Sequence, residues 1–303
     1  MRVRTPIAIM LGIFIAMHLM ALALVQFYPT DYRAFQDTSS PVNPLIYIIM
    51  LLTMTAFILI MLRYGLGKVI RAIFLGAAGI SCVFVLYPLV YQMVPDLDIS
   101  FYLSIAISAV LVVLMIFKAE WYIVNAVGFI VGVGAAIILG ISLSVLPVMI
   151  LLIVLAVYDA ISVYKTKHMI SLAEGVVPLR LPVIFIIPKN KGFKMSDLDN
   201  KPLTGDSEER EAMFMGVGDA VIPAILTISA AVFLPMSANG LENANYLVAL
   251  GVVTGSALGF FALMRFVLKG NPQAGLPLLN GGAIGGYLLT YLLVFQSLNL
   301  GMF

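Results

Sequence analysis

Two aspartates, Asp159 and Asp219, are the only acidic residues well inside the long apolar segments of this chain. Asp159 ends the apolar run Leu151–Tyr158, and Asp219 directly follows Gly216–Gly218. An ionisable side chain at membrane depth is costly, so it usually marks a functional site and has a partner. Here each aspartate is the obvious partner of the other, and a pair of aspartates indicates acid–base chemistry on water.

Two carboxylates in contact cannot both ionise cheaply, so they share one proton. The ionised carboxylate can take a proton from water while the protonated one polarises a carbonyl group. Water then attacks directly, through a gem-diol, and no covalent bond to the enzyme forms. The sequence offers no Ser/His, Cys/His or HExxH constellation for another route.

The remaining metal-ligating residue types are sparse. Cys82 is the only cysteine, and His18 and His168 lie far apart in the sequence. No Cys/His cluster has the spacing of a zinc site, so we expect neither a metal nor a cofactor. We interpret His168 as an interfacial or loop histidine.

The composition is that of a polytopic integral membrane protein, with 62% hydrophobic and 11% charged residues. Soluble domains are about half apolar and about a quarter charged. Nine apolar segments, each of about 20 residues, predict an all-α protein with nine transmembrane helices. The segments are Pro6–Phe27, Pro44–Leu62, Val69–Met93, Ile99–Phe117, Trp121–Gly140, Val145–Tyr164, Met213–Leu234, Ala244–Leu268 and Leu276–Leu298.

The distribution of charge predicts how the chain is oriented. Arg2 and Arg4 precede the first segment, which is longer than the core of a usual signal peptide, and we expect it to be an uncleaved span. If the N-terminus is cytoplasmic, 16 of the 17 basic residues fall inside, with Arg33 as the exception. We therefore expect a multi-pass cell-membrane protein with a cytoplasmic N-terminus and an extracytoplasmic C-terminus.

This orientation puts the two aspartates at similar depth. Asp159 lies six residues before Lys165, about 9 Å from the cytoplasmic end of the sixth segment. Asp219 lies eight residues after Glu211, about 12 Å from the start of the seventh segment. Depth does not fix the rotation of either helix, but it allows the carboxylates to meet.

The chain divides into three parts by position: residues 1–164 with six helices, a cytoplasmic loop over 165–212, and residues 213–303 with three helices. In the loop, Val183–Ile187 is rich in β-branched residues, which predicts a short strand or an interfacial segment. The stretch Lys189–Glu211 is dense in charged residues and glycine, which predicts a flexible, solvated segment.

The loop also gives a hypothesis about the substrate. An extended peptide could add as a strand to Val183–Ile187, or to the residues just before Met213, by β-augmentation. Unwinding of this kind is needed because a helical peptide bond is shielded within its own helix.

Two short motifs contain the aspartates. Tyr158-Asp159 and the GxGD sequence Gly216–Asp219 are each weak signals, because glycine is common in membrane helices. Their combination, at the inner ends of consecutive spans with a polar loop between them, is far more specific. On these motifs, and in its nine-span layout, the chain resembles the presenilin and signal peptide peptidase family of intramembrane aspartyl proteases, most closely the archaeal presenilin homologues.

The resemblance implies roles for individual residues. Both motif aspartates are catalytic in that family, which carries over to Asp159 and Asp219. It also implies active-site support or substrate binding by Tyr158, Gly216 and Gly218.

A third family motif, Pro-Ala-Leu, opens the last helix. The matching residues here are Leu276, Pro277, Leu278 and Leu279, with Leu278 in place of the alanine. The resemblance implies that these residues support the active site or bind substrate. Read from the residues alone, Pro277 either leaves a backbone carbonyl unpaired near the aspartates or is an ordinary first-turn proline.

Glycines gather on the last two segments, at spacings that predict close helix packing. They are Gly251, Gly255, Gly259, Gly281, Gly282, Gly285 and Gly286. Candidate polar contacts in the helix bundle, whose partners the sequence does not identify, are Gln92, Asn125, Asn280 and Tyr291.

We interpret the chain as an intramembrane aspartyl protease that hydrolyses peptide bonds within transmembrane segments. The expected partners are transmembrane protein or peptide substrates, by analogy single-span proteins with an outside N-terminus, and the lipid bilayer. We expect no nucleic acid, and a homo-oligomer stays open. The alternatives are a proton-coupled transporter or channel, a prepilin-type peptidase, and a scaffold whose aspartates only hold helices together.

Overall fold

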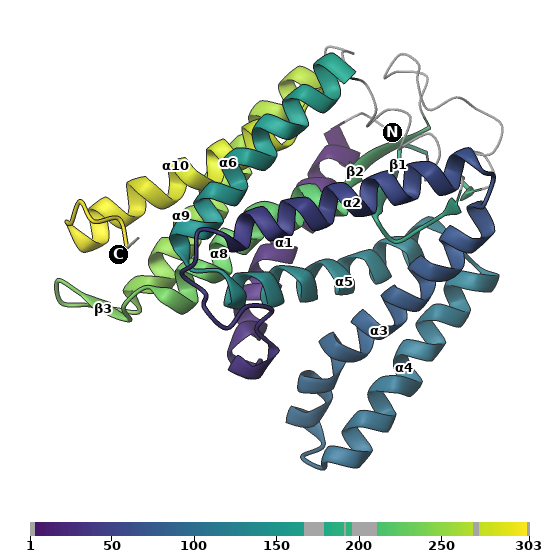
Figure 1. The fold of residues 1–303 in the computed structure, drawn as a ribbon, viewed down its shortest axis with the longest axis horizontal. Coiled ribbons are helices and arrows are strands. Elements are labelled where there is room, and N and C mark those ends of the chain that lie inside the picture. The colour runs from purple at the N-terminus through teal and green to yellow at the C-terminus, as the bar shows by residue number, and fades with distance from the viewer. Residues whose placement is uncertain (1–3, 167–178, 191, 196–210, 269–272, 302–303) are drawn as a thin grey trace. The chain divides into compact units, whose positions relative to one another are not determined.

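The computed structural model describes residues 4–166, 179–190, 192–195, 211–268 and 273–301 (Figure 1). Within these ranges lie nine α-helices, eight of them long and apolar enough to cross a membrane. They are α1 (Arg4–Leu24), α2 (Asn43–Arg63), α3 (Gly67–Met93), α4 (Leu97–Phe117), α5 (Trp121–Ser142), α6 (Val145–Ile161), α8 (Val217–Phe233), α9 (Ala244–Val267) and α10 (Leu276–Phe295). The predicted all-α membrane fold is confirmed.

Short elements lie between and beside these helices. Single 3₁₀ turns cover Val25–Phe27 and Thr30–Tyr32, and a π-helix, Ser162–Thr166, continues α6. A two-residue hairpin, β3 (Ser237–Ala238) and β4 (Leu241–Glu242), follows α8.

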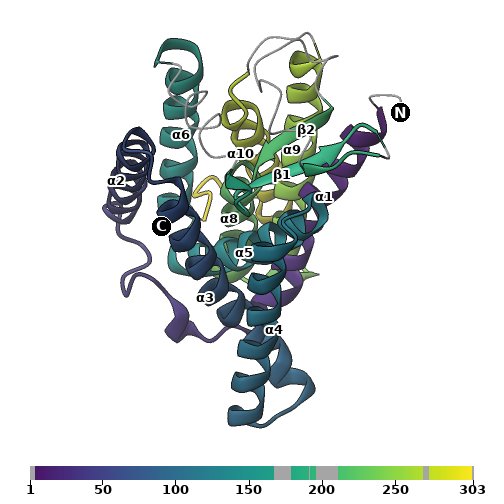
Figure 2. The same ribbon diagram turned by 90° about the vertical axis from the view of Figure 1, so that its right-hand side faces the viewer.

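The seventh predicted segment differs from expectation, because it is not helical throughout. Ala212–Gly216 forms strand β2, and α8 begins only at Val217, which leaves α8 with 17 residues. Strand β2 pairs antiparallel with β1 (Ile184–Pro188), as Figure 2 shows. A helix beginning at Met213 would leave β1 without this partner, so the ladder determines where the helix starts.

The predicted strand in the loop is therefore confirmed, and its pairing extends beyond the two strands. Val217 N–H donates to the Val183 carbonyl at 2.9 Å, and Lys189 N–H donates to the Glu211 carbonyl at 2.8 Å.

The chain folds into two compact units, each built from three stretches of sequence. Unit 1 comprises Met1–Ile13, Met54–Gly134 and Met169–Gly218, and unit 2 comprises Phe14–Thr53, Ala135–His168 and Asp219–Phe303. The division into 1–164, 165–212 and 213–303 follows chain order and stays a prediction.

Unit 1 contains the α3–α4 pair and the β1–β2 sheet. Ser108 on α4 donates from its hydroxyl to the Gly79 carbonyl on α3 at 2.6 Å. Phe193 and Met195 are buried in its core together with Ile186. This differs from the solvated segment predicted for Lys189–Glu211, because two apolar side chains there join the core; residues 196–210 and His168 lie outside the described residues.

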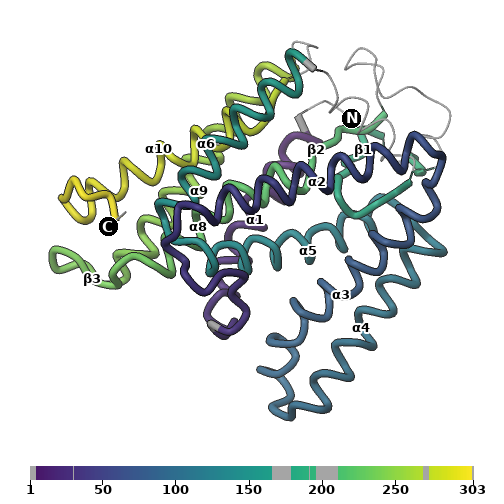
Figure 3. Tube along the Cα trace, in the orientation of Figure 1, coloured from purple at the N-terminus to yellow at the C-terminus, as the bar shows by residue number. Residues whose placement is uncertain are grey.

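Unit 2 contains α6, α8, α9 and α10, which carry both aspartates. Helices α9 and α10 run beside each other along most of their length, and α6 lies along α10, as the tube in Figure 3 shows. Leu151 and Leu155 on α6, Phe260 on α9 and Tyr287 on α10 are almost fully buried. These apolar contacts fix the helices that present Asp159 and Asp219.

Candidate active site

Asp159 lies two residues before the end of α6, and its side chain is only 6% exposed. Its Oδ2 accepts a hydrogen bond from the backbone N–H of Leu276 at 3.0 Å, and the N–H of Gly275 also interacts with this carboxylate. Leu276 is the first residue of α10. The first turn of a helix has N–H groups without helical partners and the positive end of the helix dipole, so it favours a carboxylate.

Asp219 lies in the first turn of α8 and is partly buried. A methyl group added at the Cα of Gly275 would lie 3.7 Å from Oδ2 of Asp219 and 3.8 Å from its Cγ. Asp219 therefore approaches from α8 the residue Gly275, whose N–H interacts with Asp159 from α6. These distances and standard backbone dimensions limit the separation of the two Oδ2 atoms to about 10 Å.

The structure thus answers the question of rotation that the sequence left open. Both carboxylates belong to unit 2, and both lie close to Gly275. Tyr158, the other residue of the first motif, is partly buried on α6. Within the described residues, no group of three or more His, Cys, Asp or Glu side chains is arranged to hold a metal ion.

The glycines of the GxGD motif lie at the junction of strand and helix. Gly216 is the last residue of β2, and Gly218 is in the first turn of α8. Gly218 is exposed, and a Cβ at this position would meet no atom within 4 Å. The chain therefore has open space next to Asp219 at this point.

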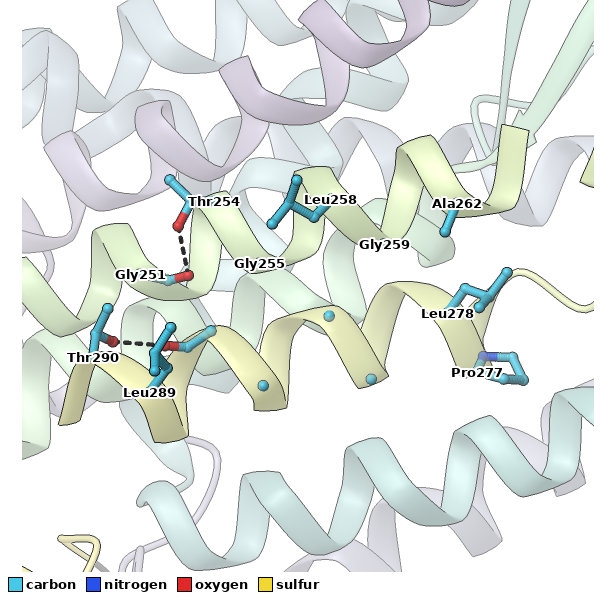
Figure 4. Close-up of a pocket in the computed structure, with 14 residues that line it drawn as sticks. Gly251, Thr254, Gly255, Leu258, Gly259, Ala262, Pro277, Leu278, Leu289 and Thr290 are labelled. Atoms are coloured by element: carbon cyan, nitrogen blue, oxygen red, sulfur yellow. Dashed lines mark hydrogen bonds between the residues drawn. The ribbon is translucent and has the colours of Figure 1, made fainter. Parts of the chain in front are cut away.

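The four residues that match the Pro-Ala-Leu motif divide between two sides of α10. Leu276 and Leu279 are buried. Pro277 and Leu278 instead line one end of an open groove of about 450 Å³ along α9 and α10 (Figure 4). Pro277 lies in the first turn of α10, as the simpler of the two sequence interpretations expected.

Close packing of α9 on α10 at glycine is confirmed. A Cβ at Gly255 would meet the Gly282 carbonyl and the backbone of Gly286, and one at Gly259 would meet the Leu278 carbonyl. Gly281 and Gly285 differ, because a Cβ at either position would meet nothing within 4 Å. We call the contact of Gly251, Gly255 and Gly259 with α10 the glycine seam.

Side chains at three positions, Asn280, Asp159 and Tyr164, make polar contacts between α6 with its π-helix and α10 with the residues just before it. Asn280 donates from Nδ2 to the Leu152 carbonyl at 2.9 Å. Toward the end of α6 follows the hydrogen bond from the Leu276 N–H to Asp159. In the π-helix, the Tyr164 hydroxyl donates to Oε1 of Gln273 at 2.9 Å. We call this set the polar seam. Tyr164 and Gln273 were not singled out from the sequence, because each lies at the polar edge of a span, where such residues are common.

A second residue that the sequence did not assign contacts the helix of Asp219. His18 on α1 is fully buried, and its Nδ1 lies 2.9 Å from the hydroxyl oxygen of Thr227 on α8. Its ring also contacts Phe14, which in turn contacts Phe260 on α9. His18 thus links α1 to α8, and its position inside the first apolar segment was the only signal in the sequence.

The β1–β2 sheet has one edge that is closed by a side chain. Asn125 on α5 donates from Nδ2 to the Ile186 carbonyl and accepts from the Ile186 N–H, both at 2.8 Å. The backbone groups of Ile186 therefore point away from β2, so Ile186 and Phe214 form a pair without mutual hydrogen bonds. On β2, the N–H and C=O of Phe214 point the other way, and none of the described residues pairs with them.

Comparison with known proteins agrees with this geometry. The family described as signal-peptide peptidase, presenilin aspartyl protease matches residues 11–296. Among curated proteins, no sequence matches the chain significantly.

Two solved structures, each described as a presenilin family intramembrane aspartate protease, are similar over nearly the whole chain. The one in space group C222 has a TM-score of 0.70 and 32% identity, and covers 95% of this chain and 100% of that chain. The one in space group P2 has a TM-score of 0.67 and 34% identity, and covers 94% and 97%.

A fold of membrane-spanning helices with this likeness defines an intramembrane-cleaving aspartic endopeptidase. The chain belongs to the signal peptide peptidase and presenilin aspartyl protease family.

Proposed function

We propose that Asp159 and Asp219 are the catalytic pair with which this protease hydrolyses peptide bonds inside transmembrane segments. The observation that supports the proposal most directly is that two carboxylates from different helices lie close to the same residue, Gly275. A scaffold needs one carboxylate to cap α10, but it has no use for a second one beside it.

The reaction uses one proton shared by the pair. The ionised carboxylate removes a proton from a water molecule, and the protonated one donates to the carbonyl oxygen of the substrate as the water oxygen bonds to the carbonyl carbon. As the C–N bond of the gem-diol then breaks, one of its hydroxyl groups returns its proton to the ionised carboxylate and becomes the carbonyl of the new acid. The leaving nitrogen takes the proton of the other carboxylate, so the pair again holds one proton. The N–H of Leu276 holds Oδ2 of Asp159 in a fixed orientation throughout.

The decisive experiment compares purified wild-type protein with Asp159→Asn and Asp219→Asn on a single-span test peptide in detergent or liposomes. Each change removes one carboxylate without altering side-chain size, and we expect cleavage to fall by about 10²–10⁴-fold. Asp98→Asn is the matched control, because Asp98 is an exposed acid on α4 outside the site.

All three variants should fold like the wild type. Turnover should fall in the two active-site variants and stay at the wild-type level in Asp98→Asn. Full activity in either active-site variant would refute the catalytic pair. Ion or proton flux that persists while no peptide is cut would support the transporter alternative instead.

We also infer that an extended substrate pairs with the outer edge of β2. Two features support this: Asn125 closes the β1 edge at Ile186, and the backbone groups of Phe214 are directed outward on β2. Only Val217 and Gly218 separate β2 from Asp219 in the chain. A substrate strand added to β2 gains main-chain hydrogen bonds that hold its peptide bonds unwound.

Proline at Phe214 tests this inference. Phe214→Pro removes the outward N–H but no bond of the β1–β2 ladder, so we expect the fold to persist and KM to rise at least about fivefold, the equivalent of one hydrogen bond. Phe214→Leu is the control, since it keeps the N–H and changes only the ring. Equal kinetics of the two variants would refute pairing at β2.

The positive-inside distribution supports a cytoplasmic N-terminus, an extracytoplasmic C-terminus and a cell-membrane location. By analogy with presenilins, the favoured substrates are single-span proteins with an outside N-terminus. Because Cys82 is the only cysteine and is buried, a Cys82→Ala chain provides a background for labelling. A cysteine at Asp98 should react with an impermeant reagent from outside intact cells, and labelling from inside only would reverse the assignment.

A further inference from the structure

The helix that carries Asp159 changes its type three residues later, at Ser162. Residues Ser162–Thr166 form a π-helix. In an α-helix, the residue one turn beyond position i on the same face is i+4, whereas a π turn accommodates one more residue. Tyr164 is at i+5 from Asp159, so the π turn brings it to the side of α6 that Asp159 faces.

The Tyr164 hydroxyl contacts the segment that leads into α10. It donates to Oε1 of Gln273 at 2.9 Å and accepts from the N–H of Ala274 at 3.4 Å. Leu276, whose N–H binds Asp159, lies two residues beyond Ala274. A hydroxyl and a carboxylate from one helix thus hold both ends of the short segment 273–276.

We propose that Tyr164 is a positioning residue, which holds segment 273–276 so that the Leu276 N–H stays on Asp159. The proposal rests on the catalytic role proposed above for Asp159. Tyr164 is 57% exposed, and its hydroxyl bonds water when the contact opens, so the contact contributes little to global stability. Its loss instead gives segment 273–276 more freedom, and the orientation of the Asp159 carboxylate becomes less fixed.

If Tyr164 is a positioning residue, its loss should lower kcat without lowering the stability of the protein. We expect Tyr164→Phe, which removes only the hydroxyl, and Gln273→Leu, which removes its acceptor, each to lower kcat about fivefold, the equivalent of one hydrogen bond. KM and the thermal unfolding midpoint should stay close to wild type. Because both changes remove the same contact, the double variant should be no slower than the slower single variant.

Tyr102→Phe is the matched control, because Tyr102 is an exposed tyrosine on α4, distant in sequence from the site. Unchanged kcat in Tyr164→Phe, multiplied losses in the double variant, or a loss that follows a lower unfolding temperature would overturn the proposal. An inactive Asp159→Asn beside a fully active Tyr164→Phe would reject the positioning role alone. An active Asp159→Asn would reject the catalytic assignment, whatever Tyr164 shows.

Discussion

Helix α10 packs against both α6 and α9 in unit 2, and it is held to these two helices in different ways. Toward α6, the polar seam uses directed hydrogen bonds, such as those from Asn280 to Leu152 and from Leu276 to Asp159. Toward α9, the glycine seam brings backbone against backbone at Gly255 and Gly282. The glycine seam fixes where the helix lies, whereas the polar seam fixes where individual atoms of the candidate site lie. Stability and activity should therefore respond to different substitutions on one helix.

Among the changes that test this comparison, the largest effect is expected on the glycine seam. Gly282→Ala should destabilise the protein by about 2–3 kcal/mol, because the new methyl would meet the Gly255 carbonyl and approach Cα of Gly259 to 3.1 Å. Its neighbour Gly281 has open space, so Gly281→Ala should be neutral or stabilising by up to about 1 kcal/mol. Unfolding in detergent, by heat or denaturant, measures both. Equal shifts in the two variants would mean that the seam is not tightly packed.

Next in size is a change at the candidate site itself. Gly275→Ala fits a backbone with φ of −79°, so the fold should persist. The methyl would lie 3.7 Å from Oδ2 of Asp219, in space that substrate and water need, and we expect kcat to fall about tenfold. Steady-state cleavage of the test peptide is the measurement. Wild-type kcat would show that the reacting water does not lie beside Gly275.

A smaller effect is expected where the polar seam is fully buried. Asn280→Leu removes the bond to Leu152, but Oδ1 of Asn280 has no hydrogen-bond partner among the described residues, so an apolar side chain of similar size also removes an unsatisfied atom. Hydrogen bonds between membrane helices contribute about 0.6 kcal/mol on average. Stability should change by no more than this, and kcat by no more than about threefold. A loss of several kcal/mol would show that the seam also fixes the helix position.

The smallest effect is expected from restoring the motif alanine. Leu278 lines the groove along α9 and α10, and the contacts of Asp159 and Asp219 are with Gly275 and Leu276. Leu278→Ala should leave kcat and KM within about twofold, less than about 0.5 kcal/mol. The same peptide assay measures both constants. A tenfold change in KM would show that this groove is part of the substrate site.

The membrane class and eight of the helices could be predicted because apolar length is a local property of the sequence. The pairing of Asp159 with Asp219 could be proposed for a similar reason, since a carboxylate inside an apolar run is conspicuous wherever its helix points. Neither the length of an apolar run nor a carboxylate within it shows how the helix is rotated about its axis. That is why the sequence did not predict that both carboxylates lie close to Gly275.

Two further misses have a common physical cause. Met213–Gly216 is apolar enough to continue α8, but its backbone bonds go to β1, a partner more than 20 residues away in the sequence. Phe193 and Met195 are likewise buried by neighbours that are distant in sequence, although the residues around them are charged. Local composition cannot reveal such partners. The spacing of the glycines did predict close helix packing, but not that α9 packs on α10.

At Gly255 and Gly259 the seam brings α9 against backbone atoms of α10, so no side chain can rotate there to loosen the two helices. The hydrogen bonds toward α6 are few, and each can open without the others. When α10 shifts to admit a chain, we expect it to carry α9 along as one body and to part from α6. A peptide arriving from the lipid should therefore find its entrance between α6 and α10, immediately beside Asp159.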